Sequence, residues 1–531
     1  MTGESGEPRA DSTGAAGSSE PDWLRDSVRA RIEAFASADV VGRIWAKDHT
    51  VWRPDPKEIT DRLGWLTVHD EMRAHVDDLR TFARGCWADG FRTAVLAGMG
   101  GSSLAPEVFR STFGAGPDGL DLIVLDTTHP DQILEVERSL DLDRTLFVIS
   151  SKSGTTLETR SHFAHFWDRF PKGASYVAIT DPGTPLVGVA EEHGFRRVFH
   201  NPPDIGGRYS ALSYFGLVPA ALVGADTGRL TSSAAAMART CGPETPAAEH
   251  PGLRLGIALG EAALAGRDKL AFVLPSDTAS LGAWIEQLIA ESTGKEGRGI
   301  VPIEGATLGP PGVYGNDRIF AAAGDAGGRI LEWLARAGHP VERVSPSGRE
   351  HLGAQMFLWE FATAVAGAVL GIHPFDQPDV QAAKDATAAV LKGGEIPPVD
   401  RGDLGAILHA GGPPHYLAIQ AYLARTAAVA ERLTSVRERI RDHLRMATTV
   451  GFGPRFLHST GQLHKGGPPT GLFVQVVEPP RADVPIPGED FTFGKLLAAQ
   501  AAGDLQALRD RGRPVARVDL SELERATARL A

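Results

Sequence analysis

Residues 150–159, SSKSGTTLET, gather hydroxyl side chains, a glycine and a lysine in one short segment. They directly follow the apolar run Thr145–Ile149 and precede a segment with a helical pattern. Hydroxyl groups and backbone N–H groups at the start of a helix form a compact cup for a phosphate group. Because the spacing of a nucleotide-binding P-loop is missing, a single phosphomonoester is favoured over a triphosphate. A cluster of N-cap residues is the alternative, although caps would explain only two of the hydroxyls.

A second loop, residues 98–106 with the sequence GMGGSSLAP, follows the apolar run Thr93–Ala97. Its glycines let the backbone approach a ligand closely, and the helix that it begins would offer unpaired N–H groups to an anion. A tight strand-to-helix turn without a ligand is the alternative. The two loops together indicate a site for a small anionic molecule.

Arg208 and Glu291 are candidates for acid–base chemistry. Arg208 lies beside a glycine pair in DIGGRYS, and its permanently charged guanidinium can stabilise an oxyanion. Glu291 lies near the predicted C-terminus of a helix that stops at Gly294. The negative end of the helix macrodipole disfavours the charged form of a carboxylate there, which makes Glu291 a better proton acceptor. Gln287 precedes Glu291 by four residues and shares its helix face. A surface arginine and a solvated glutamate are the alternatives.

Two more segments contain candidate groups. In HPFDQPDVQAAK, residues 373–384, Pro378 is expected just inside a helix start, with Lys384 two turns further along. RFLHSTGQLHKGG, residues 455–467, is a glycine-rich loop that contains His458 and His464. A solvated helix lysine and a polar surface loop are the alternatives.

Alternating strands and helical segments must position these residues, which predicts an α/β fold with parallel sheets. The strands read as continuous apolar runs, so helices should cover both faces of each sheet. We expect strands at Thr93–Ala97, Leu122–Leu125, Thr145–Ile149 and Tyr176–Ile179. A second set is expected at Leu270–Leu274, Gly299–Ile303, Arg318–Ala322 and Val341–Val344.

The predicted organisation has four parts. Residues 1–20 contain no branched aliphatic or aromatic side chain and form a disordered tail. Residues 21–245 form a helical N-terminal segment and a first parallel-sheet domain, and residues 246–400 form a second. Residues 401–531 form a mixed α/β extension, with a helical stretch at Tyr416–Met446, a loop at Gly451–Pro469 and a strand at Leu472–Val477.

Composition excludes several classes of protein. The chain has 531 residues, 42% of them apolar and 23% charged, which is ordinary for a globular protein. A net charge of −12 argues against a nucleic-acid-coating protein. Two cysteines without metal-ligand spacing exclude a disulfide framework and a thiolate zinc site, and they suit the reducing cytoplasm. The N-terminus shows no signal peptide, and the apolar stretch Met356–Ile372 contains Glu360 and is expected to be a core helix rather than a membrane anchor.

Taken together, the segments resemble the glucose-6-phosphate isomerase family. GMGGSSLAP and SKSGTTLET resemble its glycine loop and phosphate loop, and GGRYS, ESTGKEGRG and FDQPDVQAAK resemble its Arg, Glu and Lys segments. The C-terminal part, ATTVGFGPRFLHSTGQLHKGGPPTG, is most similar to the isomerase half of bacterial transaldolase/glucose-6-phosphate isomerase fusions. Because the segment before residue 90 is short, we expect no transaldolase activity.

The resemblance implies two sugar-isomerase (SIS) domains in a cytoplasmic homodimer that interconverts glucose 6-phosphate and fructose 6-phosphate without metal or cofactor. Residue by residue, it implies that Glu291 shuttles the proton between C2 and C1 and that Arg208 stabilises the cis-enediolate. Lys384 and a histidine would assist ring opening. The binding residues implied are Gly101, Ser102, Ser151, Lys152, Ser153, Thr156 and Gln287, with Glu158 orienting the histidine.

The histidine segment departs from the family pattern. In relatives it lies between the Glu and Lys segments, and its histidine reaches the site from the neighbouring subunit. Here HSTGQ follows the Lys segment, so His458 is the candidate and the subunit that supplies it stays open. Two other functions remain as alternatives: an isomerase that also accepts mannose 6-phosphate, and a non-catalytic SIS regulator that binds a sugar phosphate. The regulator would not need Arg208, Glu291 and Lys384 together.

Overall fold

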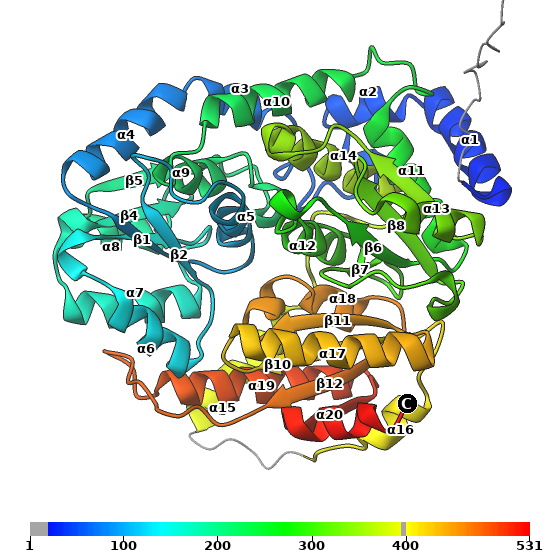
Figure 1. Cartoon of the computed structure of the whole chain (residues 1–531). Coiled ribbons are helices and arrows are strands. Elements are labelled where there is room, and N and C mark those ends of the chain that lie inside the picture. The colour runs from blue at the N-terminus through cyan, green and yellow to red at the C-terminus, as the bar shows by residue number, and fades with distance from the viewer. Residues whose placement is uncertain (1–19, 394–399, 531) are drawn as a thin grey trace, which may run out of the picture.

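The computed structural model describes residues 20–393 and 400–530. The predicted N-terminal tail therefore lies outside the described residues, apart from Glu20. Three parallel sheets, each flanked by helices, form the framework of the described chain (Figure 1). The predicted α/β fold with parallel-sheet domains is confirmed.

The first sheet has five strands in the order β2-β1-β3-β4-β5, and the second has four in the order β7-β6-β8-β9. The strands of the first are β1 (Thr93–Ala97), β2 (Asp121–Leu125), β3 (Thr145–Ser150), β4 (Tyr176–Thr180) and β5 (Arg197–His200). Those of the second are β6 (Lys269–Val273), β7 (Val301–Ile303), β8 (Arg318–Ala323) and β9 (Val341–Val344). All eight predicted strands are present, and β5 was not predicted.

A third sheet lies in the C-terminal region, in the order β11-β10-β12-β13. Its strands are β10 (Tyr416–Tyr422), β11 (Ala447–Phe452), β12 (Gly471–Val477) and β13 (Val515–Val518). The three sheets repeat one winding order, in which the first strand is central and the second lies outside it. Since crossovers between parallel strands are right-handed, this order brings the loops after the first and third strands of each sheet to one edge.

The helices can be grouped by the sheet that they accompany. The N-terminal segment contains α1 (Asp22–Ser37), α2 (Val40–Trp45), α3 (Val68–Arg73) and α4 (Val76–Ala88). The first sheet is flanked by α5 (Leu104–Phe113), α6 (Pro130–Ser139), α7 (Leu157–Arg169), α8 (Pro185–Glu192) and α9 (Tyr214–Leu222). With the second sheet come α10 (Thr227–Thr240), α11 (Pro251–Leu264), α12 (Leu281–Thr293), α13 (Gly328–Arg336) and α14 (Leu352–Leu370). Helix α15 (Gln381–Gly393) connects the second sheet to the C-terminal unit. That unit contains α16 (Leu404–His409), α17 (Ala427–Leu444), α18 (Gly461–Gly466), α19 (Phe493–Asp510) and α20 (Leu520–Ala528).

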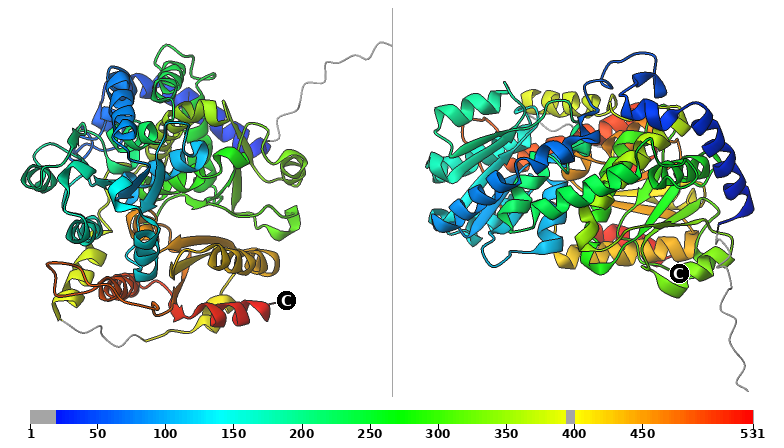
Figure 2. Two further views of the ribbon diagram at one scale, coloured as in Figure 1. Left: turned by 60° about the vertical axis from the view of Figure 1, so that its left-hand side comes forward. Right: turned by 90° about the horizontal axis from the view of Figure 1, so that it is seen from above.

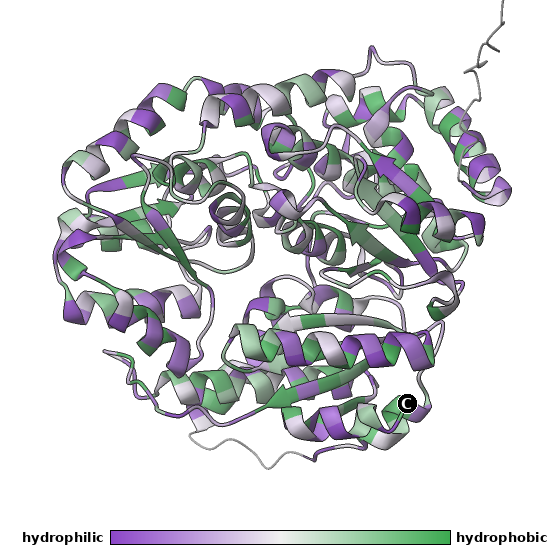
Figure 3. Cartoon of the chain, in the orientation of Figure 1, coloured by the Kyte–Doolittle hydropathy of each residue, from purple (hydrophilic) through white to green (hydrophobic). Residues whose placement is uncertain are grey.

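Helix α14 is the central helix of the largest hydrophobic cluster, and it packs against α10, α11 and α12. By length and composition, one helix of the described residues could cross a membrane, Arg349–Leu370, which contains α14. Within the protein, 94% of its apolar window is buried, as expected for the predicted core helix. In Figure 3 the strands of the sheets are predominantly hydrophobic, whereas the outer helices show mixed faces.

The predicted helical stretch at Tyr416–Met446 is wrong in its first part, because residues 416–422 form the central strand β10. All seven of these residues are buried. A continuous apolar run covered on both faces has no alternating pattern, so a central parallel strand and a buried helix look alike in the sequence. The helix of this stretch, α17, begins only after Thr426, whose side chain accepts a hydrogen bond from the Val429 N–H.

The C-terminal unit, residues 400–530, packs against both preceding units (Figures 1 and 2). Tyr416, Phe473 and Leu505 share a hydrophobic cluster with strands of the second sheet. Val484, Phe491 and Phe493 share another with strands of the first sheet. Because apolar side chains interdigitate across both contacts, the C-terminal unit holds its loops in a fixed position over the other two units.

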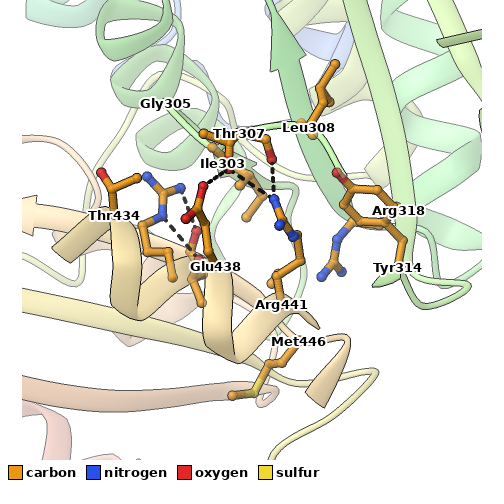
Figure 4. Close-up of a pocket in the computed structure, with 15 residues that line it drawn as sticks. Ile303, Gly305, Thr307, Leu308, Tyr314, Arg318, Thr434, Glu438, Arg441 and Met446 are labelled. Atoms are coloured by element: carbon orange, nitrogen blue, oxygen red, sulfur yellow. Dashed lines mark hydrogen bonds between the residues drawn. The ribbon is translucent and has the colours of Figure 1, made fainter. Parts of the chain in front are cut away.

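Figure 4 shows part of the seam between the second sheet and α17. Thr307 Oγ1 donates to Glu438 Oε1 at 2.8 Å, and Arg441 donates to the Thr307 carbonyl at 2.8 Å. A cavity of only about 30 Å³ remains between these groups. That is little more than the space of one water molecule, so the seam is a packed interface rather than a ligand site.

Candidate active site

The phosphate loop predicted at residues 150–159 connects β3 to the N-terminus of α7. Ser153 and Thr155 are exposed and Thr156 is half-buried, and all three line a cavity of about 470 Å³. Their hydroxyls, together with the N–H groups at the start of α7, form a cup suited to an anion. Thr155 was not singled out from the sequence, although it lies in the same hydroxyl run.

Two residues of this loop do not face the cavity. Ser151 is buried, and its hydroxyl hydrogen-bonds Thr156 Oγ1 at 3.0 Å and accepts the Gly154 N–H at 3.1 Å, which braces the turn. The Lys152 ammonium is ion-paired with Asp181 and donates to the Pro203 carbonyl at 3.1 Å. The sequence predicted both as phosphate ligands, but the structure makes Ser151 a brace and directs the Lys152 ammonium to Asp181.

The glycine loop lies where three loops converge. Gly100 has a φ of +56°, and a Cβ atom there would lie 2.6 Å from the His458 carbonyl and 3.0 Å from Gln287 Nε2. A Cβ at Gly101 would lie 2.0 Å from the Gly207 carbonyl oxygen. Only glycine permits this approach. Gly101 and the buried Ser102 on the 3₁₀ turn η3 (Gly100–Ser102) are thereby held against η6 (Gly207–Tyr209) and its Arg208.

Arg208 is buried and almost fully saturated by hydrogen bonds within the protein. Nε donates to Ser292 Oγ at 2.8 Å, and Nη1 donates to Gln377 Oε1 at 2.7 Å. Nη2 donates to the backbone carbonyls of Pro374 and Asp376 at 2.8 and 2.9 Å. Of the five N–H groups of a guanidinium, four are thus used and one on Nη1 remains. Burial excludes the surface-arginine alternative.

Glu291 lies in the last turn of α12, as the sequence predicts, and its carboxylate faces Arg208. Its Oε1 is 3.6 Å from Arg208 Nη1. Gln287 Nε2 donates to Glu291 Oε2 at 3.1 Å and to the His458 carbonyl at 2.8 Å. Both side chains are buried, so the solvated-glutamate alternative does not hold. Gln287 therefore joins the candidate base to the loop that contains His458.

His458 is the last residue of the 3₁₀ turn η10 (Arg455–His458) in the C-terminal unit, and its side chain enters the cavity beside α7. Its Nε2 lies 2.9 Å from Glu158 Oε1 in the same chain. Burial raises the pKa of Glu158, but the charge and hydrogen bond of His458 outweigh burial and hold that pKa at about 2. Glu158 is therefore ionised near neutral pH. Arg455 Nε, 3.3 Å from Asp126 Oδ2, anchors the turn at its other end.

Lys384 lines the same cavity, but the helix around it differs from the prediction. Helix α15 begins at Gln381 rather than near Pro378, so Lys384 lies in its first turn instead of two turns along. The Asp379 N–H is used by Gln462 Oε1 at 2.8 Å, a contact from the C-terminal unit that delays the helix start. Lys384 is exposed and lines the cavity, where its ammonium can supply a positive charge.

Other site residues were not predicted. Ser292 and Gln377 accept hydrogen bonds from Arg208. Lys295 donates to the His373 carbonyl and to Asp376 Oδ1 at 2.5 and 2.6 Å, which fixes the loop beneath Arg208. Burial, followed by the charge of Arg208, lowers the pKa of Lys295 to about 7. Their proximity to the recognised motifs was a signal for these residues, since Ser292, Lys295 and Gln377 all lie within the Glu and Lys segments.

The C-terminal unit also contributes Lys465 and Gln500 to the cavity wall. Lys465 Nζ lies 2.5 Å from Asp504 Oδ1 in a fully buried ion pair. Lys465 lies in the histidine segment, residues 455–467, but was not singled out, and no sequence motif pointed to Gln500. Among the residues that the structure describes, no group of three or more His, Cys, Asp or Glu side chains could hold a metal ion.

The chain is similar to known proteins over the part that forms this site. Residues 48–300 match the family described as phosphoglucose isomerase. A glucose-6-phosphate isomerase of Rubrobacter xylanophilus is 29% identical over 390 residues, which cover 62% of this chain and 89% of that protein. A glucose-6-phosphate isomerase of Thermus thermophilus is also 29% identical, over 388 residues that cover 62% of this chain and 90% of that protein.

Solved structures show the same fold. A hypothetical protein from Thermus thermophilus aligns with a TM-score of 0.59 and 26% identity, over 70% of this chain and 98% of that one. A glucose-6-phosphate isomerase from Chlamydia trachomatis aligns with a TM-score of 0.51 and 22% identity, over 68% of this chain and 79% of that one. The chain is thus similar to the phosphoglucose isomerase family over residues 48–300, and it shares its fold with these solved structures.

Proposed function

We propose that the protein interconverts glucose 6-phosphate and fructose 6-phosphate through ring opening and a cis-enediolate. The observation that supports this most directly is the grouping of an acid–base dyad, Glu158–His458, with the hydroxyls of the phosphate loop in one cavity of about 470 Å³. Gln287 connects this cavity to Glu291 and Arg208. A sugar phosphate would place its phosphate on Ser153, Thr155 and Thr156.

Ring opening is assigned to His458 with Lys384. The imidazole takes the proton from the O1 hydroxyl, the C1–O5 bond breaks, and O5 receives a proton. With Nε2–H donated to the Glu158 carboxylate, Nδ1 is the ring nitrogen left to exchange a proton with the sugar. Lys384, at the rim, supplies a positive charge to O5 or to the phosphate.

Isomerisation is assigned to Glu291 and Arg208. Glu291 takes the proton from C2, and the electron pair of that C–H bond forms the C1=C2 bond of the enediolate while negative charge moves to O1. The remaining Nη1–H of Arg208 is available to that oxyanion. Glu291 then returns the proton to C1 while the hydroxyl proton of O2 passes to O1, so that O1 becomes a hydroxyl and O2 becomes the carbonyl oxygen of the ketose. Gln287 holds the carboxylate in place through both steps.

His458 completes the site of its own chain, so the proposed chemistry needs no residue from a second subunit. We keep the cytoplasmic homodimer implied by the family resemblance as a prediction. In this chain, dimerisation would not be needed to supply the histidine.

A coupled assay tests the function. With fructose 6-phosphate as substrate, we expect glucose 6-phosphate to form and to reduce NADP through an added glucose-6-phosphate dehydrogenase. Mannose 6-phosphate in a second arm decides whether the enzyme also accepts the C2 epimer. The Glu291→Gln variant controls for contaminating isomerase. Binding of the sugar phosphate by the wild-type protein without turnover would instead support the SIS regulator.

A further inference from the structure

Gln500 on α19 lies behind the Glu158–His458 dyad and contacts Glu158 directly. Its Nε2 donates to Glu158 Oε1 at 2.7 Å, which is the same oxygen that His458 Nε2 approaches at 2.9 Å. The Gln500 side chain is buried and also lines the cavity. One carboxylate oxygen therefore receives two hydrogen bonds, both from the C-terminal unit.

The orientation of the Gln500 amide follows from its partners. An ionised carboxylate only accepts hydrogen bonds, so the NH₂ group must face Glu158 and the carbonyl must face away. On that side Thr128 Oγ1 donates to Gln500 Oε1 at 2.8 Å, and Thr128 is fully buried. Thr128 donates to Gln500, and Gln500 and His458 both donate to Glu158, so the amide has only one possible orientation.

Helix α19 holds Gln500 rigidly at this position. One turn further along the helix, Asp504 forms the buried ion pair with Lys465. On the neighbouring face α19 packs along α15, and a Cβ at Gly503 would lie 2.8 Å from Thr387 Oγ1. The same helix thus packs against α15, which contains Lys384, and determines where Glu158 points.

We propose that Gln500 is a positioning residue for ring opening: it fixes the Glu158 carboxylate so that His458 presents Nδ1 to the sugar. The proposal rests on the proposed isomerase function. Gln500 acts through Glu158, and Thr128 acts through Gln500. Neither residue belongs to the motifs that indicated the site.

The first test replaces Gln500 by leucine. We expect kcat with cyclic glucose 6-phosphate to fall about tenfold, as is typical when the partner that orients a catalytic group is lost. Turnover of an open-chain analogue that lacks the ring-closing hydroxyl should change by less than about twofold, because Glu291 and Arg208 are untouched. Thr128→Val should show the same selectivity to a smaller degree.

Gln475→Leu is the matched control. Gln475 is a buried glutamine of the same unit, and its Nε2 donates to the Ala501 carbonyl on α19 at 2.9 Å without contact to Glu158. If Gln475→Leu lowers cyclic turnover as much as Gln500→Leu does, or if both Gln500→Leu activities fall together, Gln500 has only a structural role and the proposal is wrong.

A second variant, Gln500→Glu, keeps the shape but changes the hydrogen-bond donor. When protonated, the new carboxyl group can donate to Glu158 as the amide does, and when ionised it repels Glu158. The activity of the variant relative to wild type should therefore rise as the pH falls, whereas Gln500→Leu should give no such rise. The charged and titratable groups around the dyad include His162, Lys384, Tyr422, Lys465 and Asp504, and they are common to both variants.

A measurement without turnover separates this proposal from the proposed function. The imidazole ¹⁵N signals of His458, assigned by comparison with His458→Ala, report which ring nitrogen holds the proton. We expect wild type to hold it on Nε2 and Gln500→Leu to show a mixture of tautomers. Identical spectra would overturn the positioning role even in an active enzyme. A shifted spectrum in a protein without isomerase activity would show that Gln500 orients the dyad, but it would refute the function and with it the role in ring opening.

Discussion

His458 Nε2 and Glu158 Oε1 lie 2.9 Å apart, although 300 positions of the chain separate the two residues. Glu158 belongs to the first parallel-sheet unit, and His458 belongs to the third. The dyad is therefore a contact between units of one chain, and its geometry depends on how the C-terminal unit packs against the first.

The within-chain origin of His458 can be tested by mixing subunits. The substitution His458→Ala removes the residue assigned to ring opening, and Glu291→Gln removes the residue assigned to proton transfer at C2. Because each chain builds its own site from both residues, every site in the mixture contains one lesion, and we expect the mixture to stay inactive. Recovery of up to about one quarter of wild-type activity on equal mixing would show that His458 acts across a subunit interface.

Glu291→Gln should abolish isomerisation while preserving sugar-phosphate binding. The amide has nearly the same shape but cannot accept the C2 proton, and loss of a general base costs about 10²–10⁴-fold in rate. Exchange of the C2 hydrogen with solvent tritium should fall in parallel with turnover. A variant within a few-fold of wild type would mean that Glu291 is not the base.

Arg208→Lys should be severely impaired although the charge is retained. An ammonium cannot reach Ser292, Gln377 and the two backbone carbonyls that hold the planar guanidinium. We expect kcat to fall about 10²–10³-fold, as for loss of an oxyanion donor. Arg298→Lys, in the same region but bonded to the Leu370 carbonyl, is the control. An effect on KM alone would limit Arg208 to ground-state binding.

Ser153→Ala and Thr156→Val should weaken phosphate binding. A hydrogen bond to a charged group is worth about 1.5–3 kcal/mol, so the inhibition constant of inorganic phosphate should rise about tenfold or more for each variant. Ser161→Ala on α7, whose hydroxyl donates to the Leu157 carbonyl, should leave inhibition unchanged. Equal inhibition of all three variants would place the anion elsewhere.

Glu360, on the buried helix α14, predicts a pH-dependent stability. Burial raises its pKa well above the usual range, and both carboxyl oxygens lack a partner among the described residues. The folded state thus keeps a proton that the unfolded chain releases above about pH 4.3, so stability falls as the pH rises from there. Glu360→Leu should gain about 1–3 kcal/mol at pH 8 and less at pH 5, measured by denaturant unfolding. An equal gain at both pH values would contradict this reading.

Much of the first two units was predictable from local patterns. Runs such as Thr93–Ala97 and Thr145–Ile149 are short, apolar and bounded by turn residues, so their strand character is local. Strand β5, Arg197–His200, was not predicted because two of its four residues, Arg197 and His200, are polar and the strand lies at the edge of the sheet. Strand β10, Tyr416–Tyr422, was predicted as a helix because a strand that is buried on both faces shows no alternation of apolar and polar residues.

The motifs identified the cavity, but not the contacts between its residues. The roles of Ser151 and Lys152 depend on how the loop turns and on Asp181, which lies 29 residues away from Lys152. The start of α15 depends on Gln462, and the orientation of Glu158 depends on Gln500. These last two are tertiary contacts with the C-terminal unit, and no local periodicity or motif in the sequence encodes them. The likeness of that unit to the isomerase half of transaldolase fusions remains a prediction.

Because η10 and α19 belong to the third unit, His458 and Gln500 are synthesised after the other residues of the site. Domains generally fold as units from the N-terminus while the chain is being synthesised. When the first two sheets have emerged from the ribosome, the nascent chain already contains the phosphate loop, Arg208 and Glu291, but it still lacks His458 and Gln500. Such a chain has no Glu158–His458 dyad, so under the proposed mechanism it cannot open a ring until α19 has been synthesised and has packed against α15.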